Sequence, residues 1–456
     1  MVGSIGYKPI GHNPGKVMIK LKFLTPLYLM CLVLALSCKK DPSHGVAFEG
    51  GQVFNGQTFE SKTFYVINGL ISFNPPGTLD STIQLDRHYV IPPFGDAHTH
   101  NLADPSKIDS LEKKYVQDGI YYVQVLTNYA SKADSVRDRF SSPETIDVKY
   151  ANGGLTSTLG HPHLAYETSA LNLHWSAMFS QRDRIKQSRL AENDAYWFLD
   201  TTEDVAQKWD AILTIKPDLI KIYLINTERH EALVEAEQMG NFGLSEDVAR
   251  LVVKKAHEAG LKVYAHVENA YDFRVGLNIG VDGFGHLPGY SWDGKADVDM
   301  YRLTDEDIAK AKDRNIVIIP TANFAQVYAV KYDNRGNPSL DSLRYETVNQ
   351  FLTKELKRLN KAGVSIALGA DQDGETSILE ANYLVDKLEA FDRLTALKLL
   401  AETTPQTIYP DRKIGELKEG YEASFLVLSG NPLNNWDYID SINLYVKQGK
   451  FLNIKQ

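Results

Sequence analysis

Short apolar runs alternate with amphipathic helical segments through the middle of this chain, and this alternation limits its fold more than any other feature of the sequence. The clearest helical segment spans residues 244–260, where Ser245 is the expected N-cap and Gly260 the expected end. Seven runs are typical of buried strands: Ile120–Leu126, Asp147–Tyr150, Leu219–Leu224, Lys262–His266, Gly283–His286, Ile316–Pro320 and Ser365–Leu368. With the run that precedes His98, they make eight strand–helix units. This pattern predicts an α/β fold, a (β/α)8 TIM barrel.

Side chains that can bind a metal lie at or just past the ends of these runs. Because the strand ends of a TIM barrel face one mouth, such side chains are expected to converge. Imidazole and carboxylate suit divalent metals such as zinc. Taken singly, each residue also fits an ordinary role, such as a core histidine, a solvent-reaching lysine or a turn aspartate. The predicted set is His98, His100, Lys221, His266, His286 and Asp371.

The lysine in this set needs a chemical explanation, because an ammonium group repels a divalent cation. A carbamate, formed from the neutral amine of Lys221 and carbon dioxide, would instead offer anionic oxygens that can bridge two metals. The order His-x-His, Lys, His, His, Asp on strands one, four, five, six and eight resembles the amidohydrolase superfamily. The similarity is to its two-metal branch with a carboxylated lysine, which includes imidazolonepropionase-like and prolidase-like members, and it covers roughly residues 46 to 454.

The resemblance implies two divalent metal ions, zinc being favoured, and carbon dioxide for the carboxylation of Lys221. It places the first histidine pair and Asp371 on the more buried metal, and His266 and His286 on the second. A hydroxide that the metals generate from water would cleave a C–N bond of an amide or short peptide, open or cyclic. Asp371 is the expected catalytic proton shuttle as well as a ligand.

Other reactions of the same superfamily remain open at this stage. Deaminases of this fold usually carry a glutamate three residues after the strand-five histidine, where this chain has Asn269. Glu268 comes one residue early and is expected on the opposite face. Lys221 also argues against a deaminase, whereas lactone or ester hydrolysis stays an alternative. A different class is a lipoprotein that binds a metal or solute without turnover.

Two further residues are candidates for substrate binding. His161 follows strand three in Gly160-His-Pro-His163, where related peptide-cleaving members often place a Gly-His, and Tyr223 lies two residues beyond Lys221. A hydrogen bond within a loop is the alternative for His161, and core packing is the alternative for Tyr223. Long segments at 164–200, 288–303 and 323–341 are expected to overhang the mouth, with Trp175, Trp197 and Trp292 in them.

The two ends of the chain carry a different pattern, of short strands with turn signals. Asn68-Gly69 between two alternating runs predicts a hairpin, and residues 414–420, 423–428 and 444–452 are expected strands. These ends resemble the two halves of the small β-sandwich that accompanies amidohydrolase barrels. The predicted domains are therefore a β-sandwich of residues 46–91 plus 405–456 and a barrel of residues 92–404, which a chain of 456 residues is long enough to build.

The first 37 residues are typical of a secretory signal, with lysines before an apolar run from Phe23 to Ser37. The run ends in Leu34-Ala-Leu-Ser-Cys38, which resembles a bacterial lipoprotein processing site. Cys38 would then carry the lipid, residues 38–45 would be a tether, and the protein would be exported to the periplasm or cell surface. An ordinary cleaved signal peptide is the alternative. After Cys38 the chain has no cysteine, which excludes thiolate ligands and disulfides there.

The charge balance bears on partners. The net charge is −9, and the four lysines of the leader would leave with it, so the mature chain is still more acidic. This argues against nucleic acid and against charge-driven binding to anionic membranes. The expected partners are a small-molecule amide or peptide substrate and a membrane reached only through the lipid anchor. Whether the chain forms a homo-oligomer is open.

Overall fold

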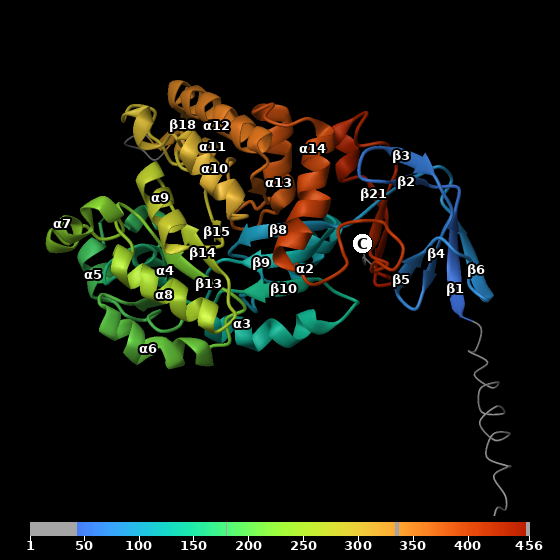
Figure 1. Cartoon of the computed structure of the whole chain (residues 1–456). Helices are drawn as coiled ribbons and strands as arrows, with labels where there is room; N and C mark the ends of the chain where they lie inside the picture. Colours follow the sequence, from blue (N-terminus) through green and yellow to red (C-terminus); the bar gives the residue numbers. More distant parts are fainter. Residues whose placement is uncertain (1–42, 179, 333–336, 453–456) are drawn as a thin grey trace, which may run out of the picture. The chain divides into compact units, whose positions relative to one another are not determined.

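The computed structural model describes residues 43–178, 180–332 and 337–452, and residues 44–456 cluster into one compact unit (Figure 1). The predicted signal peptide, Cys38 and most of the predicted tether lie outside the described residues. The last two tether residues, His44 and Gly45, begin strand β1 (His44–Glu49). Within the described part of the chain, no helix has the length and apolar character needed to cross a membrane.

Ten parallel strands form the centre of this unit, in two sheets whose orders are β10-β9-β8 and β12-β11-β13-β14-β15-β16-β19. The predicted strands are present, although several are shorter than expected. The bounds are β8 Phe94–Thr99, β9 Ile120–Val125, β10 Asp147–Tyr150, β11 Gly154–Thr156, β12 Tyr196–Phe198, β13 Ile220–Tyr223, β14 Val263–His266, β15 Gly283–Phe284, β16 Val317–Ile318 and β19 Ser365–Ile366.

Backbone hydrogen bonds join the two sheets at both edges of the smaller one. On one side, Ala97 in β8 donates to the carbonyl of Leu368 (2.8 Å), just after β19, and Asp371 donates to the carbonyl of His98 (2.9 Å). On the other side, the N–H of Asp218 donates to the carbonyl of Tyr150 (2.8 Å), which brings the end of β10 beside the segment that enters β13. Apart from β12, which lies at the edge of the larger sheet beyond β11, the strands are arranged in chain order, and their apolar side chains belong to one core cluster.

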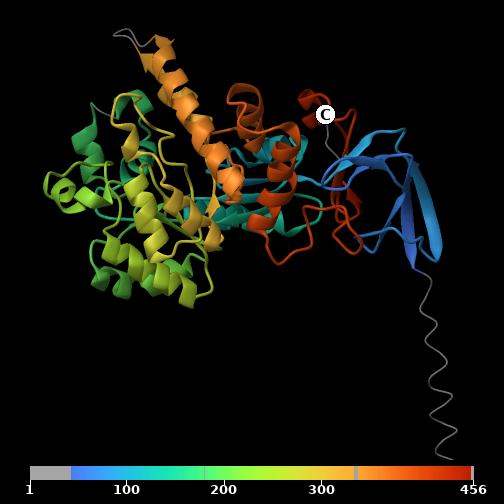
Figure 2. The same ribbon diagram turned by 45° about the horizontal axis from the view of Figure 1, so that its top comes forward.

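Helices alternate with these strands and lie around them in both views (Figures 1 and 2). Helix α8 (Glu246–Glu258) confirms the predicted segment: Gly260 follows it with a φ of +73°, and the N–H groups of Gly260 and Leu261 donate to His257 and Ala256. Ser245 occupies the N-cap position, but its side chain makes no capping hydrogen bond. The other main helices are α2 Ile108–Gln117, α3 Ala130–Val136, α4 His163–Ala170, α5 Arg182–Gln187, α6 Thr202–Thr214, α7 His230–Glu235, α9 Ala270–Ile279, α10 Asp305–Asp313, α11 Phe324–Tyr328, α12 Ser342–Ala362, α13 Ser377–Asn382, α14 Arg393–Lys398 and α15 Thr404–Ile408.

Strands from the two ends of the chain pair with each other, and the blue and red segments lie side by side in Figures 1 and 2. One sheet has the order β22-β21-β20-β7-β2-β3 and a second has the order β5-β4-β1-β6. A separate apolar cluster is made of residues from both ends of the chain, among them Phe48, Phe64 and Phe425. The bounds are β2 Gln52–Phe54, β3 Phe59–Ser61, β4 Phe64–Ile67, β5 Leu70–Ser72, β6 Thr78–Gln84, β7 Tyr89–Ile91, β20 Phe425–Leu428, β21 Ile442–Lys447 and β22 Lys450–Phe451.

The hairpin prediction at Asn68-Gly69 is confirmed. Both residues have positive φ, and they connect the antiparallel strands β4 and β5. The strand predicted at residues 414–420 is wrong, because this segment has no strand geometry. It instead runs beside β5, where Gly420 donates to the carbonyl of Ile71 and Ile71 donates to the carbonyl of Tyr421.

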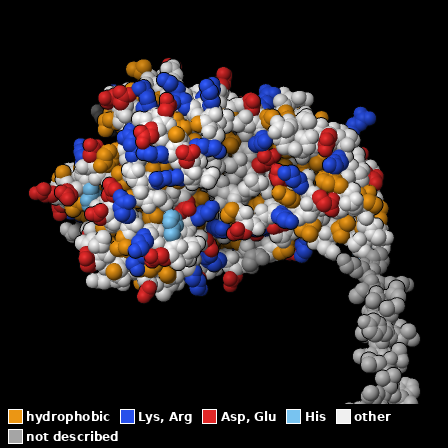
Figure 3. Space-filling view, in the orientation of Figure 1, with side chains coloured by type: hydrophobic (Ala, Val, Ile, Leu, Met, Phe, Trp, Pro, Cys, Tyr) orange, Lys and Arg blue, Asp and Glu red, His pale blue; other side chains and the backbone are white. Residues whose placement is uncertain are grey.

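On the face that Figure 3 shows, basic and acidic side chains are interspersed.

Two glycines with positive φ allow the packing between the ends and the centre to be tested. Gly119 and Gly260 have φ values of +74° and +73°, but a Cβ at Gly119 would lie 2.6 Å from Leu426 Cδ1, whereas a Cβ at Gly260 meets nothing within 4 Å. We expect Gly260→Ala to lower the free energy of unfolding by about 1 kcal/mol, from the left-handed backbone alone. Gly119→Ala should lose roughly 1–3 kcal/mol more, because it also crowds β20. Urea unfolding of both variants measures this; equal losses would contradict the packing described.

Candidate metal centre

The six predicted ligand residues come from five different strands, and the structure brings them together. His98 lies in β8 and His100 directly after it, and His266 is the last residue of β14. Lys221 is the second residue of β13 rather than its last. His286 and Asp371 lie in the loops after β15 and β19. The imidazole centroids of His98 and His286 are 4.8 Å apart, and those of His286 and His266 are 4.4 Å apart.

Asp371 is at the centre of this group. Its Oδ1 lies 3.4 Å from His98 Nε2 and 3.0 Å from His100 Nε2, and its Oδ2 lies 3.8 Å from His286 Nε2. His98, His100 and Asp371 each offer a ligand atom, and these atoms all lie within 4.8 Å of one another. Such a convergence of two imidazoles and one carboxylate fits a divalent metal.

The outer nitrogens of two histidines are held by hydrogen bonds that fix their protonation. His100 Nδ1 lies 2.7 Å from the carbonyl of Thr127, which can only accept. His286 Nδ1 lies 2.7 Å from Thr321 Oγ1, whose own proton goes to the carbonyl of Pro320. Both histidines therefore carry the proton on Nδ1 and present the lone pair of Nε2 toward Asp371. Such outer contacts orient metal ligands in proteins.

Strained backbone accompanies these contacts. Thr127, Thr321 and Asp371 have φ values of +136°, +48° and +56°. Residues with a side chain adopt this region at a cost of order 1–3 kcal/mol each, and threonine does so rarely. The surrounding packing maintains these conformations. Thr127 and Thr321 each bind a histidine of the group, and Asp371 is its central carboxylate.

Lys221 is the unusual member of the group. Its side chain is 1% exposed, and its Nζ makes no hydrogen bond with any described residue. Burial lowers the pKa of Lys221 to about 7, which increases the neutral amine fraction at physiological pH. Gly285 lies against it: a Cβ at Gly285 would collide with Lys221 Nζ and lie 3.1 Å from His98 Cε1. A buried amine without a partner beside histidines fits a lysine that is carboxylated in its functional form.

Burial also keeps His98, His266 and His286 neutral, as metal ligands must be. It lowers the pKa of His98 and His266 well below the ordinary range, and the nearby Lys221 ammonium adds to this effect. For His286 burial is again the main cause, followed by the neighbouring His266 and His98.

Both residues predicted to bind substrate lie beside this group. The ring centroid of His161 is 4.9 Å from that of His266 and 5.0 Å from that of Tyr223. Burial lowers the pKa of His161 to about 3, so the ring is neutral. Tyr223 is 2% exposed, and its hydroxyl pairs with Thr127 Oγ1 at 2.8 Å. Tyr223 therefore also supports the loop that holds His100.

Two buried carboxylates support the site from behind. Asp96 accepts hydrogen bonds from the N–H groups of His98 (3.2 Å) and Ser377 (3.1 Å), and from the hydroxyl of Tyr115 (3.3 Å). Glu380 in α13 accepts from Ala322 N (2.8 Å), Asn323 N (2.9 Å) and Asn323 Nδ2 (2.8 Å). Asn323 Nδ2 also donates to the carbonyl of Ala370 (3.1 Å). Glu380 thus holds the loop of Thr321 beside the segment that carries Asp371.

Two site residues were missed or misplaced by the sequence reasoning. Tyr290 stacks on His286, with ring centroids 4.2 Å apart and planes at 7°. Glu268 was expected to face away, but its Oε1 lies 3.5 Å from His266 Nε2. That prediction is wrong, because β14 ends at His266 and residue 268 is two positions later, on the same side. Asn269 is the N-cap of α9 and accepts from Asp272 N (2.9 Å).

The predicted long loops contribute to the site only in part. Trp197 lies in strand β12 and is buried, and Trp292 packs against Tyr301 and Phe351 and donates to the carbonyl of Ala296 (3.0 Å). Trp175 lies in a short 3-10 helix, Trp175–Ala177. The aromatic residue that reaches the histidines from these loops is Tyr290, four residues after His286.

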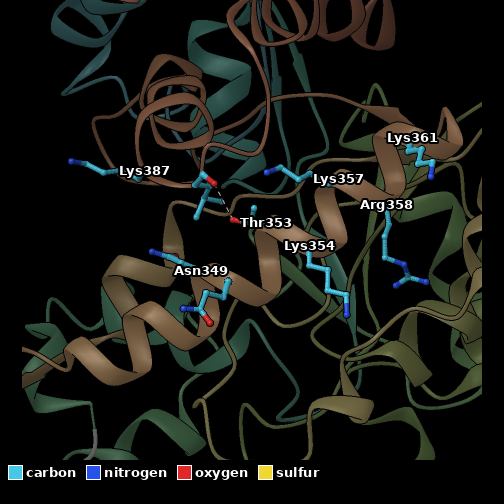
Figure 4. A pocket seen from close by; sticks show the side chains of 9 residues that line it. Asn349, Thr353, Lys354, Lys357, Arg358, Lys361 and Lys387 are labelled. Atoms are coloured by element: carbon cyan, nitrogen blue, oxygen red, sulfur yellow. Dashed lines mark hydrogen bonds between the residues drawn. The ribbon is translucent and has the colours of Figure 1, made fainter.

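A separate pocket lies on the surface of α12 (Figure 4). Its lining includes Lys354, Lys357, Lys361 and Lys387, and none of its residues belongs to the histidine group. In Figure 4 these lysines point in different directions rather than toward one point. The pocket is therefore a basic surface feature apart from the candidate metal centre.

Comparisons with known proteins bear on the fold of this chain. No known protein-family profile matches the chain. Ochratoxinase of Aspergillus niger is 24% identical over 193 residues, which cover 42% of this chain and only 37% of that enzyme. Its crystal structure superposes with a TM-score of 0.67 and 17% identity, covering 90% of this chain and 96% of the other.

Other solved structures share the fold to a similar degree. An amidohydrolase gives a TM-score of 0.66 at 16% identity, with 90% of this chain and 98% of the other covered. A Xaa-Pro dipeptidase with methionine in its active site gives 0.65 at 16% identity, with 90% and 100% covered. The chain therefore has the mixed α/β fold of amidohydrolases, and the resemblance predicted from the sequence is confirmed at the level of the fold. These structural neighbours are hydrolases by name.

Glu380 gives a pH prediction for the support of the site. Burial raises its pKa from 4.5 to about 7. Between these values the unfolded chain has lost this proton while the folded chain keeps it, so the Glu380 contribution to the free energy of unfolding falls as pH rises. Glutamine does not titrate, so Glu380→Gln lacks this contribution. Between about pH 5 and pH 7, the free energy of unfolding should therefore decrease less in Glu380→Gln than in the parent chain. Urea unfolding at both pH values measures the difference.

The exposed Glu346 of α12 provides the matched control. Glu346→Gln should leave the parent pH dependence unchanged. If Glu380→Gln and Glu346→Gln follow the parent curve equally, Glu380 does not hold a proton in the folded chain.

Proposed function

We propose that this chain is a metal-dependent hydrolase that cleaves a C–N bond of an amide or a short peptide, open or cyclic. The observation that carries the proposal is the convergence of four histidines, Asp371 and a buried, unpaired Lys221. The proposed ligands are His98, His100, Lys221, His266, His286 and Asp371. Two divalent ions, preferably zinc, with carbon dioxide bound as a carbamate on Lys221, fit the donor set. The fold shared with named amide and peptide hydrolases supports the same reaction class.

We also propose that the parallel strands close into a (β/α)8 TIM barrel. The hydrogen bonds from Ala97 to Leu368 and from Asp218 to Tyr150 support closure, because they join the two sheets at both edges. The paired chain ends, residues 46–91 plus 405–456, are proposed to be a separate β-sandwich beside a barrel of residues 92–404. Their own apolar cluster supports this division.

Bound divalent metals would lower the pKa of a water molecule and polarise the substrate carbonyl. The protein side chains would do the rest. Asp371, which reaches toward three histidines, is placed to take the proton of the attacking water and to deliver it to the leaving nitrogen. His161 and Tyr223 lie next to His266, on the side from which a substrate carbonyl could be contacted.

Asn269 disfavours deamination, because its side-chain oxygen already caps helix α9 and carries no proton to transfer. Lactone or ester hydrolysis requires the same metal and carboxylate, so it is the second candidate reaction. A metal-binding protein without turnover would not need a central carboxylate held in a strained backbone conformation, as Asp371 is.

Lys221 should determine how many metals the chain holds. After reconstitution with zinc and bicarbonate, elemental analysis should give close to two ions per chain in the parent, and about one or fewer in Lys221→Ala, because the bridging ligand is lost. Lys354→Ala, which changes an exposed lysine of α12, should match the parent. A ratio of one in the parent that Lys221→Ala leaves unchanged would exclude the two-metal site.

Asp371 should matter more for turnover than for metal binding. Asparagine keeps the shape and one weak oxygen ligand but cannot accept a proton, so Asp371→Asn should lose roughly 10²–10⁴-fold in kcat while metal content changes little. His266→Asn should lose metal and activity together. Near-normal turnover by Asp371→Asn on an amide that the parent cleaves would refute the mechanism.

We further propose that the protein is an exported lipoprotein anchored through Cys38, supported by the leader and by Leu34-Ala-Leu-Ser-Cys38 in the sequence. A cysteine with several acyl chains binds membranes firmly, whereas one chain binds them only marginally. Cys38→Ala should therefore move the protein out of the membrane fraction. Unchanged fractionation and gel mobility of this variant would contradict the anchor.

A further inference from the structure

An aromatic series leads from the candidate metal centre toward the surface. Tyr290, which stacks on His286, is 2% exposed. Its ring centroid lies 5.9 Å from that of Tyr328 and 6.3 Å from that of Phe324, and both belong to α11. Tyr328 is 38% exposed. A substrate that reaches the histidines from this side would pass along aromatic faces.

A carboxylate that meets no lysine or arginine among the described residues lies near the inner end of this series. The Glu268 side chain is 37% exposed, and its Oε1 is 3.5 Å from His266 Nε2. Among the described residues, no lysine or arginine lies within ion-pair distance of Glu268. The ring centroids of Tyr290 and His266 are 6.2 Å apart, so the same histidine lies near both the carboxylate and the aromatic series.

Arg344, the arginine near Tyr328, makes its hydrogen bonds to backbone carbonyls, and the loop that carries Tyr290 is held in place. Arg344 donates to the carbonyls of Trp292 (3.0 Å) and Ser291 (2.9 Å), and its guanidinium lies 6.0 Å from the Tyr328 ring. The N–H of Gly289 donates to the carbonyl of Glu268 (3.0 Å), which fixes the Tyr290 loop beside the carboxylate. Within the part of the chain that the structure describes, the Glu268 carboxylate meets His266 through Oε1, which leaves Oε2 for a ligand.

We propose that Glu268, Tyr290 and Tyr328 form a binding site for a protonated amine of the substrate. Aromatic faces together with a carboxylate attract an ammonium group, and the attraction grows when water is excluded. The inference rests on the proposed function, and it narrows the substrate class to amides that carry a free amine near the scissile bond. N-acylated counterparts, which lack the charge, should be poor ligands.

The test uses the full chain and two probes, L-leucinamide, which is cationic, and N-acetyl-L-leucinamide, which is neutral. Isothermal titration before and after zinc loading measures their affinities. The parent should bind the cation about tenfold or more tightly than the neutral probe, as expected for a hydrogen bond to a charged group. Glu268→Gln and Tyr328→Leu should each reduce this preference. Glu258→Gln, at an exposed glutamate of α8, should keep it.

Two results would overturn the inference. One is equal binding of both probes by the parent chain. The other is a Glu268→Gln variant that retains the preference, or that loses both probes together with zinc, since Glu268 would then act only by positioning His266. If the preference depends on Glu268 but the parent cleaves no amide, peptide or cyclic amide, the amine site stands and the proposed hydrolase function fails.

Discussion

The hydrogen bond from the N–H of Asp371 to the carbonyl of His98 is the contact on which the site depends. It joins the loop after the last parallel strand to the first parallel strand, and so unites residues that are far apart in the sequence. The left-handed conformation of Asp371 then directs its carboxylate back toward the histidines. Together with the bond from Ala97 to Leu368, it holds His98, His100 and Asp371 in one cluster.

The polar groups around the cluster are arranged in successive layers of hydrogen bonds. Asp371 and the histidines are innermost, and the carbonyl of Thr127 and the hydroxyl of Thr321 bind two of the imidazoles from outside. Glu380 then binds the backbone beside Thr321. Within the described site, two buried polar atoms, His98 Nδ1 and Lys221 Nζ, have no hydrogen-bond partner, and the lysine is the one that can carry a full charge. A buried amine is costly unless another group completes its environment, which supports the carboxylation proposed for Lys221.

The sequence was sufficient to predict most strands and the convergence of the six proposed ligand residues, because strand ends are marked by a switch from apolar to polar residues. It failed at residues 414–420, where a short segment between glycines is a loop whose end runs beside β5 through the bonds of Gly420 and Tyr421 with Ile71. Tyr290 and Glu268 could not be placed, since their positions depend on the path of a loop. Gly289, with a φ of +91°, turns the chain there and bonds to Glu268, and no periodicity in the sequence records such a turn.

The pairing of the two chain ends has a consequence for biosynthesis. Strand β7 leads directly into β8, which carries His98, and β7 is held on one side by β20 near the other end of the chain. During vectorial synthesis or translocation, β7 cannot acquire this neighbour until residues beyond 428 have emerged. A chain that stops early would therefore leave an unpaired strand edge beside an incomplete catalytic frame, which is the kind of surface that proteases and chaperones recognise. The fold thus couples completion of the polypeptide to completion of the site.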